Sequence, residues 1–160
     1  MSTAKSRPPQ RTKSRFRQGM FKPENPSKVI GNPNDIVYRS GWEKKFMYHL
    51  DRSSYILKWG SEPFHINYIS PKDNRKHKYY IDFITITKDK KTGENIITLI
   101  EVKPYKETLE PTSKGKKKER YLYECMTYAV NQAKWKYARA LCKEKGWQFV
   151  ILTENELGVK

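Results

Sequence analysis

Two amphipathic stretches predict helices. In the first, between residues 38 and 51, apolar side chains recur at helical spacing and Ser40 is placed to cap the helix (Trp42, Phe46, Met47 and Leu50). The second runs from Glu119 to about Gly146, a residue that suits a helix end. Its expected apolar stripe comprises Leu122, Cys125, Met126, Ala129, Val130, Ala133, Tyr137, Ala140 and Leu141.

Short apolar runs bounded by turn residues predict strands. They are Ile56 to Trp59, the alternating set Phe64, Ile66 and Tyr68, the runs Tyr79 to Ile84 and Leu99 to Val102, and Gln148 to Thr153. The order of helix, three strands with hairpins, helix and strand predicts an α/β domain with a mixed sheet flanked by helices. At 160 residues the chain is long enough for one such domain.

Residues 1–35 form a different segment. They are basic, interrupted by five prolines and without apolar periodicity, so we expect a basic arm that is extended or disordered when free. The arm either becomes ordered on DNA, RNA or a protein, or is a solubilising tail. Residues 36–160 are expected to form the folded domain.

Two of the predicted strands each carry an acid where an aliphatic residue is expected. Glu101 follows Asp82 by nineteen positions, and the midpoint lies between Lys91 and Thr92 in a charged turn segment that contains a glycine. Folding the hairpin there puts Asp82 and Glu101 opposite each other, with Cβ atoms about 5 Å apart. Lys103 shares the face of Glu101 because strand side chains alternate.

A third acid belongs to the first predicted helix. Glu43 precedes Phe46, Met47 and Leu50 by three, four and seven positions, so it shares the helix face that packs on the protein. It is either the edge of the apolar stripe or a carboxylate directed at a site on the sheet.

These acids have two interpretations. Asp82 and Glu101, with Glu43 directly or through water, supply the oxygen ligands that Mg²⁺ or Mn²⁺ prefers, and Lys103 can stabilise charge on a phosphate. The carbonyl of Val102 is a further candidate ligand. Alternatively, Asp82, Glu101 and Lys103 form an ordinary cross-strand ion-pair network.

The charge of the chain favours the first interpretation. The net charge is +16, from 33 Lys and Arg against 17 Asp and Glu, and such an excess favours a polyanionic partner, with nucleic acid the first candidate. Double-stranded DNA is the partner that we expect. No apolar run approaches the length of a membrane span, and no Cys/His spacing resembles a zinc site. The candidate nucleic-acid contacts are Arg15, Arg17, Lys44, Lys76, Lys114, Lys116, Lys117 and Lys118.

The set Glu43, Asp82 and Glu101-Val102-Lys103 resembles the PD-(D/E)XK nuclease superfamily. Two local stretches are similar to the head-completion nucleases of T-even-type tailed phages, and more distantly to the nuclease subunits of heteromeric transposases. These stretches are residues 38–44 with 59–62, and residues 134–136 with 149–154.

The resemblance carries expectations about fold, site and function. It implies a restriction-endonuclease-like αβββαβ core, the catalytic set Glu43, Asp82, Glu101 and Lys103, and Glu62 and Gln132 near the site. It also implies a Mg²⁺-dependent DNA endonuclease that is made in the host cytoplasm and acts in head completion at the portal or neck of the virion before tail joining. The alternatives are a structural neck or DNA-binding protein with this fold, and a transposon-end or junction-cutting nuclease.

Overall fold

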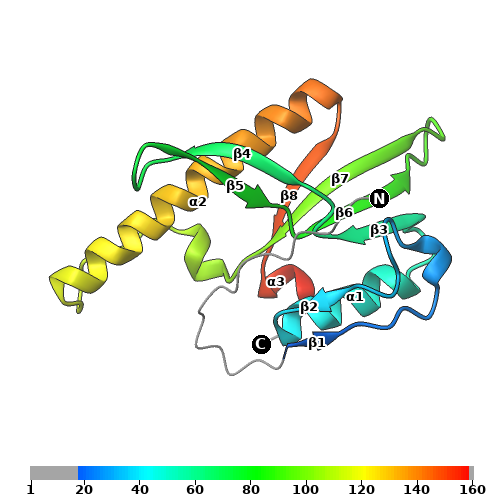
Figure 1. The fold of residues 1–160 in the computed structure, drawn as a ribbon, viewed down its shortest axis with the longest axis horizontal. Coiled ribbons are helices and arrows are strands. Elements are labelled where there is room, and N and C mark those ends of the chain that lie inside the picture. Colours follow the sequence, from blue (N-terminus) through cyan, green and yellow to red (C-terminus); the bar gives the residue numbers. More distant parts are fainter. Residues whose placement is uncertain (1–17, 159–160) are drawn as a thin grey trace.

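The computed structural model describes residues 18–158, and their centre is a four-stranded mixed sheet in the order β3-β6-β7-β8 (Figure 1). The strands are β3 (Lys58–Ser61), β6 (Phe83–Lys88), β7 (Asn95–Val102) and β8 (Gln148–Leu152). β6 pairs antiparallel with β3 and with β7, and β8 pairs parallel with β7. The mixed α/β architecture confirms the predicted fold class.

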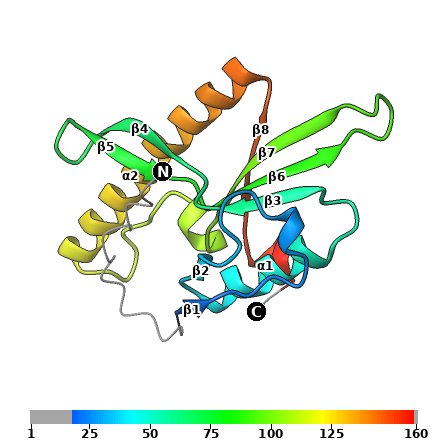
Figure 2. The same cartoon turned by 45° about the vertical axis from the view of Figure 1, so that its right-hand side comes forward.

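Helices cover both faces of this sheet. α1 (Gly41–Arg52) and the short α3 (Glu154–Leu157) lie on one face, and α2 (Lys118–Lys145) lies on the other (Figures 1 and 2). Side chains divide between two cores by strand alternation: Phe83 and Ile100 pack with α1, whereas Ile84 and Leu99 pack with α2. The face that carries Leu99 continues along β7 to Glu101.

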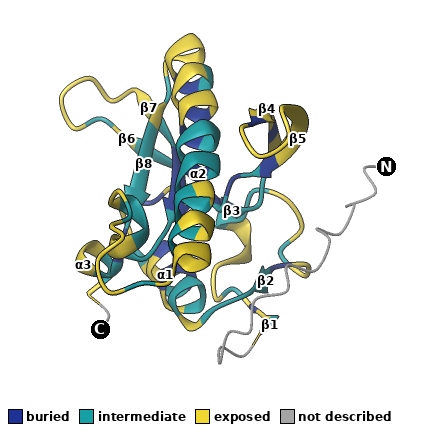
Figure 3. Ribbon diagram, turned by 90° about the vertical axis from the view of Figure 1, so that its left-hand side faces the viewer, coloured by how far each residue is buried: buried dark blue, intermediate teal, exposed yellow. Residues whose placement is uncertain are grey.

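A second, two-stranded sheet lies beside α2. It is a hairpin of β4 (His65–Ser70) and β5 (Arg75–Tyr80), and we call it the β4–β5 ribbon (Figure 3). It contributes Ile66, Tyr68 and Tyr79 to the core on the α2 side. The predicted continuous strand from Tyr79 to Ile84 is therefore wrong: the chain leaves the ribbon at Tyr80 and enters the central sheet at Phe83.

The predicted apolar stripe of α2 is correct only in part: Val130, Ala133 and Leu141 pack against the core on the α2 side. The buried residues are Asn131, Trp135, Ala138 and Cys142, whereas Leu122 is 55% exposed and Met126 is 39% exposed. The first half of α2 extends beyond the sheet, so its apolar residues have no sheet to pack against (Figure 1). The end of the helix agrees with the prediction, since Gly146 adopts the left-handed conformation with φ 70°.

The expected boundary at residue 35 falls within the described part of the chain. Residues 1–17 lie outside the described residues. Residues 18–35 contain β1 (Gly19–Met20) and the turn η1 (Pro26–Lys28), and β1 pairs with β2 (Val37–Tyr38). Phe21 is only 3% exposed and packs in the core on the α1 side, so this segment lies on the domain.

The remaining element is the turn η2 (Tyr105–Thr108), which follows β7 and begins the loop that leads to α2. Within residues 18–158, no helix combines the length and apolarity that crossing a membrane requires.

Candidate active site

The two-residue link between the ribbon and the central sheet, Ile81 and Asp82, positions Asp82. Ile81 is completely buried and anchors the link in the core on the α2 side. The backbone N–H of Glu62 donates to the carbonyl of Asp82 at 2.9 Å, one residue beyond the last pair of β3 and β6, Ser61 with Phe83. Buried Ile81 and the hydrogen bond from Glu62 therefore fix Asp82 at the start of β6.

Glu101 lies next to Asp82, as the predicted register requires. Phe83 pairs with Ile100 in the β6–β7 ladder, so the next position along brings Asp82 and Glu101 together. The backbone N–H of Val102 donates to Oδ2 of Asp82 at 2.9 Å and holds this carboxylate against β7. The observed pairing thus agrees with the register expected from the sequence.

Glu101 is buried and held by two neighbours. Its side chain is 5% exposed. The hydroxyl of Tyr79 donates to Oε2 at 2.6 Å, and Nζ of Lys103 lies 3.5 Å from Oε1. The two oxygens are thereby distinguished: Oε2 is bound by a buried tyrosine, whereas Oε1 faces the partly exposed lysine.

Glu43 approaches the same region from α1. Ser40 caps the helix, because its hydroxyl accepts from the backbone N–H of Glu43 at 3.1 Å. Oε2 of Glu43 accepts from the backbone N–H of Arg39 at 3.0 Å, and the Arg39 guanidinium pairs with Glu62 at 3.3 Å. The negative charge of Glu43 also raises the pKa of Asp82, so the two carboxylates interact.

The electrostatics of the site favour a bound cation. Burial and then the charge of Glu101 raise the pKa of Asp82 well above its ordinary value, and the lowering effects of Lys103 and the Val102 N–H do not offset them. Burial lowers the pKa of Lys103, but the carboxylates of Glu101, Asp82 and Glu107 outweigh it, so the net pKa is raised. Lys103 is therefore protonated at neutral pH, and Asp82 and Glu101 repel each other.

The donor set fits a hard divalent cation bound through two carboxylates. Oδ2 of Asp82 accepts from the Val102 N–H and Oε2 of Glu101 accepts from Tyr79. The oxygens best placed for a metal ion are therefore Oδ1 of Asp82 and Oε1 of Glu101, and Oε1 also lies 3.5 Å from Nζ of Lys103. Mg²⁺ is commonly bound by one or two carboxylates and retains several waters. Within residues 18–158, no three His, Cys, Asp or Glu side chains are arranged to hold a metal ion together, so direct ligation by Glu43 stays a prediction.

Two residues near the site were missed by the sequence reasoning. Tyr79 contacts Glu101, and Nζ of Lys134 lies 5.7 Å from the centre of the Tyr79 ring, a cation–π distance. The only available signal was the position of Tyr79 three residues before Asp82. The predicted continuous strand gave no reason to connect Tyr79 with Glu101. In the structure β5 belongs to the ribbon and does not pair with β7, so the contact arises between two sheets.

The predicted nucleic-acid contacts are spread over several elements. Lys76 is exposed on β5, whereas Lys44 lies over the ring of Tyr38 with Nζ 5.1 Å from the ring centre. In the loop before α2, Lys114 and Lys117 are exposed, Lys118 begins the helix and Lys116 pairs with Glu124. Arg15 and Arg17 lie outside the described residues. Gln132 is half-buried on α2.

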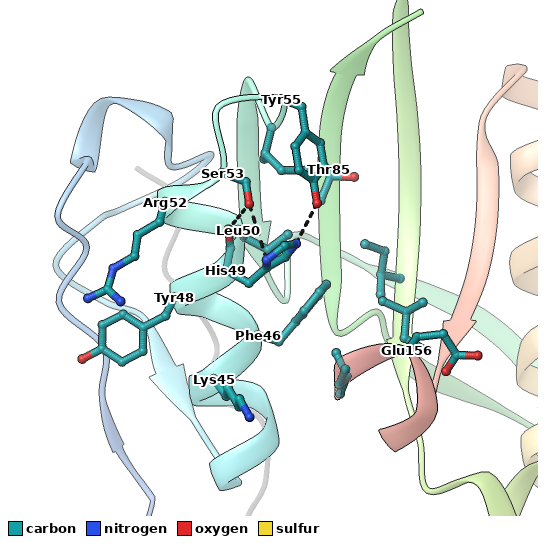
Figure 4. Close-up of a pocket in the computed structure, with 14 residues that line it drawn as sticks. Lys45, Phe46, Tyr48, His49, Leu50, Arg52, Ser53, Tyr55, Thr85 and Glu156 are labelled. Carbon is teal, nitrogen blue, oxygen red and sulfur yellow. Dashed lines mark hydrogen bonds between the residues drawn. The ribbon is translucent and has the colours of Figure 1, made fainter. Parts of the chain in front are cut away.

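A separate cavity lies on the α1 side of the sheet. Its volume is about 670 Å³, and its walls come from α1, α3 and the central strands (Figure 4). The imidazole of His49 and the hydroxyl of Tyr55 are hydrogen bonded across 2.7 Å at its rim. The cavity is lined by none of the four predicted catalytic residues, so it is distinct from the candidate active site.

Two comparisons with known proteins identify the family of the chain. The model of the TnsA-like endonuclease N-terminal domain matches residues 53–154, a range that contains Asp82, Glu101 and Lys103 but not Glu43. The head completion nuclease of Enterobacteria phage T4 is 38% identical over 143 residues, which cover 87% of this chain and 92% of that protein. Both matches confirm the resemblance to the PD-(D/E)XK nucleases. The chain belongs to the TnsA-like endonuclease family.

Proposed function

We propose that the protein is a DNA endonuclease that uses Mg²⁺, or Mn²⁺ in its place, and acts in phage head completion. The similarity to the T4 head completion nuclease and the match to an endonuclease domain support the nuclease role and its place in head completion. The observation that supports a metal-dependent activity is that Asp82 and Glu101 lie side by side where β6 begins, with protonated Lys103 beside them.

Each residue has a separate task in this proposal. Asp82 and Glu101 hold the divalent cation, which when bound activates water and offsets charge on the scissile phosphate. Lys103 supplies a positive charge to the same phosphate, because its raised pKa keeps it protonated at neutral pH. The Val102 N–H fixes the orientation of the Asp82 carboxylate, and the Glu43 charge adds to the attraction for a cation.

The catalytic proposal is tested by cleavage of linear and branched DNA duplexes in the presence of Mg²⁺ or Mn²⁺. We expect metal-dependent cutting by the unmodified protein, no detectable cutting by Asp82→Ala, and a loss of about 100- to 1000-fold for Lys103→Ala. The matched controls are Glu94→Ala and Lys90→Ala, which remove the same charges from the exposed β6–β7 turn. Equal cutting by Asp82→Ala and Glu94→Ala would contradict the site assignment.

The head-completion role carries finer proposals. We place the protein at the portal or neck of the virion, where it processes or binds packaged DNA ends before the tail joins. Heads assembled with Asp82→Ala in place of the unmodified protein test whether cleavage is required: we expect filled heads that do not join tails. Full rescue by Asp82→Ala would favour a structural neck or DNA-binding role instead.

A further inference from the structure

The β4–β5 ribbon has one face that the core does not use. Strand alternation directs Ile66 and Tyr68 of β4, with Tyr79 of β5, toward α2, where all three are buried. The opposite face, which we call the outer face, is formed by His65, Asn67, Ile69, Lys76, Lys78 and Tyr80. Five of these six residues are exposed, and Tyr80 is half-buried.

The ribbon is strongly basic and its charge is almost unopposed. Its cations are Lys72, Arg75, Lys76 and Lys78, against the single acid Asp73. Asp73 is already engaged by the His77 imidazole at 2.8 Å and the Arg75 backbone N–H at 3.1 Å. In the described part of the chain, neither Lys76 nor Lys78 forms an ion pair, so their charges are available to a partner.

The dimensions of the ribbon match a groove of duplex DNA. Two paired strands lie about 4.8 Å apart, and the major groove, about 12 Å wide, admits a two-stranded β-ribbon. The ribbon packs on α2 through one face only, and Figure 3 shows it standing beside that helix rather than within the central sheet. A duplex can therefore approach the outer face without displacing any element of the core.

The outer face is close along the chain to the candidate active site. Lys78 precedes Asp82 by four residues, a span of at most about 13 Å in extended chain. This span is shorter than half of the roughly 34 Å that one turn of B-form DNA occupies. A duplex that lies on the outer face is therefore long enough to extend past the link between Lys78 and Asp82.

We propose that the outer face of the β4–β5 ribbon enters the major groove of the duplex DNA that the nuclease cuts. Lys76 and Lys78, both on β5, contact phosphates along one wall of the groove, and the amide of Asn67, which lies opposite Lys78 on β4, faces the base edges. This inference rests on the proposed function and adds to it the surface that holds the substrate. It concerns binding rather than catalysis, so the two are tested separately.

The first experiment measures the affinity of the full chain for a short duplex in EDTA, which excludes cleavage, over a range of salt. The variant Lys76→Gln/Lys78→Gln loses two phosphate contacts, which lowers the slope of log affinity against log salt by about 1.8. Between about 50 and 200 mM salt, its affinity therefore falls about tenfold less than that of the unmodified protein. The matched control, Lys90→Gln/Lys91→Gln, removes two charges from the β6–β7 turn and retains the original slope.

The second experiment identifies the groove by methylation protection with dimethyl sulfate, which reacts with guanine N7 in the major groove and adenine N3 in the minor groove. We expect protection at guanine N7, lost in Lys76→Gln/Lys78→Gln and weakened in Asn67→Ala. An unchanged salt slope, an equal change in the control, or protection confined to adenine N3 overturns the proposal. Absence of metal-dependent cutting with these binding results intact overturns the proposed function alone.

Discussion

The hydrogen bond between Tyr79 and Glu101 gives a test of how the carboxylate is held. Both residues are buried, with 3% and 4% of their surfaces exposed, and the hydroxyl donates to Oε2 at 2.6 Å. Tyr79→Phe removes the donor and retains the ring. Hydrogen bonds to charged groups contribute about 1.5–3 kcal/mol, so we expect the free energy of unfolding, measured in EDTA, to fall by about this amount.

The same substitution is expected to change the metal requirement. With Oε2 no longer fixed, the Glu101 carboxylate can rotate, so Oε1 is less well oriented for a cation. Loss of a partner that orients a metal-binding carboxylate typically lowers metal affinity about 10- to 100-fold. The Mg²⁺ concentration for half-maximal cutting should therefore rise by that factor, while the rate at saturating Mg²⁺ changes much less.

Tyr68→Phe is the matched control for this prediction. Tyr68 lies on the same face of the ribbon, is 5% exposed and has Nζ of Lys134 5.9 Å from its ring centre. Within residues 18–158, the tyrosine that donates to Glu101 is Tyr79 and not Tyr68, so the Tyr68→Phe variant should retain the original metal requirement. An equal rise in the Mg²⁺ requirement for both variants, or for neither, would refute the reasoning.

Three further predictions concern stability, each measured by denaturant unfolding in EDTA. Burial and the charge of Glu101 raise the pKa of Asp82, so Asp82→Asn should be about 1 kcal/mol more stable at neutral pH and yet inactive; a less stable variant would contradict the role of repulsion. Glu62 has φ 45°, a conformation that favours glycine. The free energy of unfolding of Glu62→Gly should therefore be about 1 kcal/mol higher than that of Glu62→Ala, and equal values would exclude backbone strain. Ser40→Ala removes the cap of α1 and should cost about 1 kcal/mol, whereas no loss would show that the cap is dispensable.

The hairpin register was predictable because its turn is short and strongly marked. The charged segment between Lys88 and Asn95 fixes where the chain reverses, and the apolar runs on both sides then permit few pairings. The structure pairs Phe83 with Ile100, which puts Asp82 beside Glu101 as expected. The nuclease family was predictable for a similar reason, since the spacing of a few chemically distinctive residues identified it before any contact was known.

Other features depend on contacts that no local pattern encodes. The link at Ile81 and Asp82 lies within an apolar run whose pattern predicts one strand, and only the pairing of β5 with β4 and of β6 with β7 separates its two halves. The stripe of α2 was mispredicted in part because the helix is longer than the sheet it covers. Its buried face is decided by where the core ends, at Asn131, and not by the distribution of apolar residues along the whole helix.

The alternation of β5 connects the two proposals. Lys76 and Lys78 belong to the outer face of the ribbon, whereas Tyr79 points inward and donates to Glu101. Asp82 follows after a further three residues. A duplex bound on the outer face would therefore act on the same strand that orients the Glu101 carboxylate and leads into Asp82. In this arrangement the surface that holds DNA and the carboxylates that hold the cation share one rigid segment, because Tyr79 and Ile81 are both buried in the core on the α2 side.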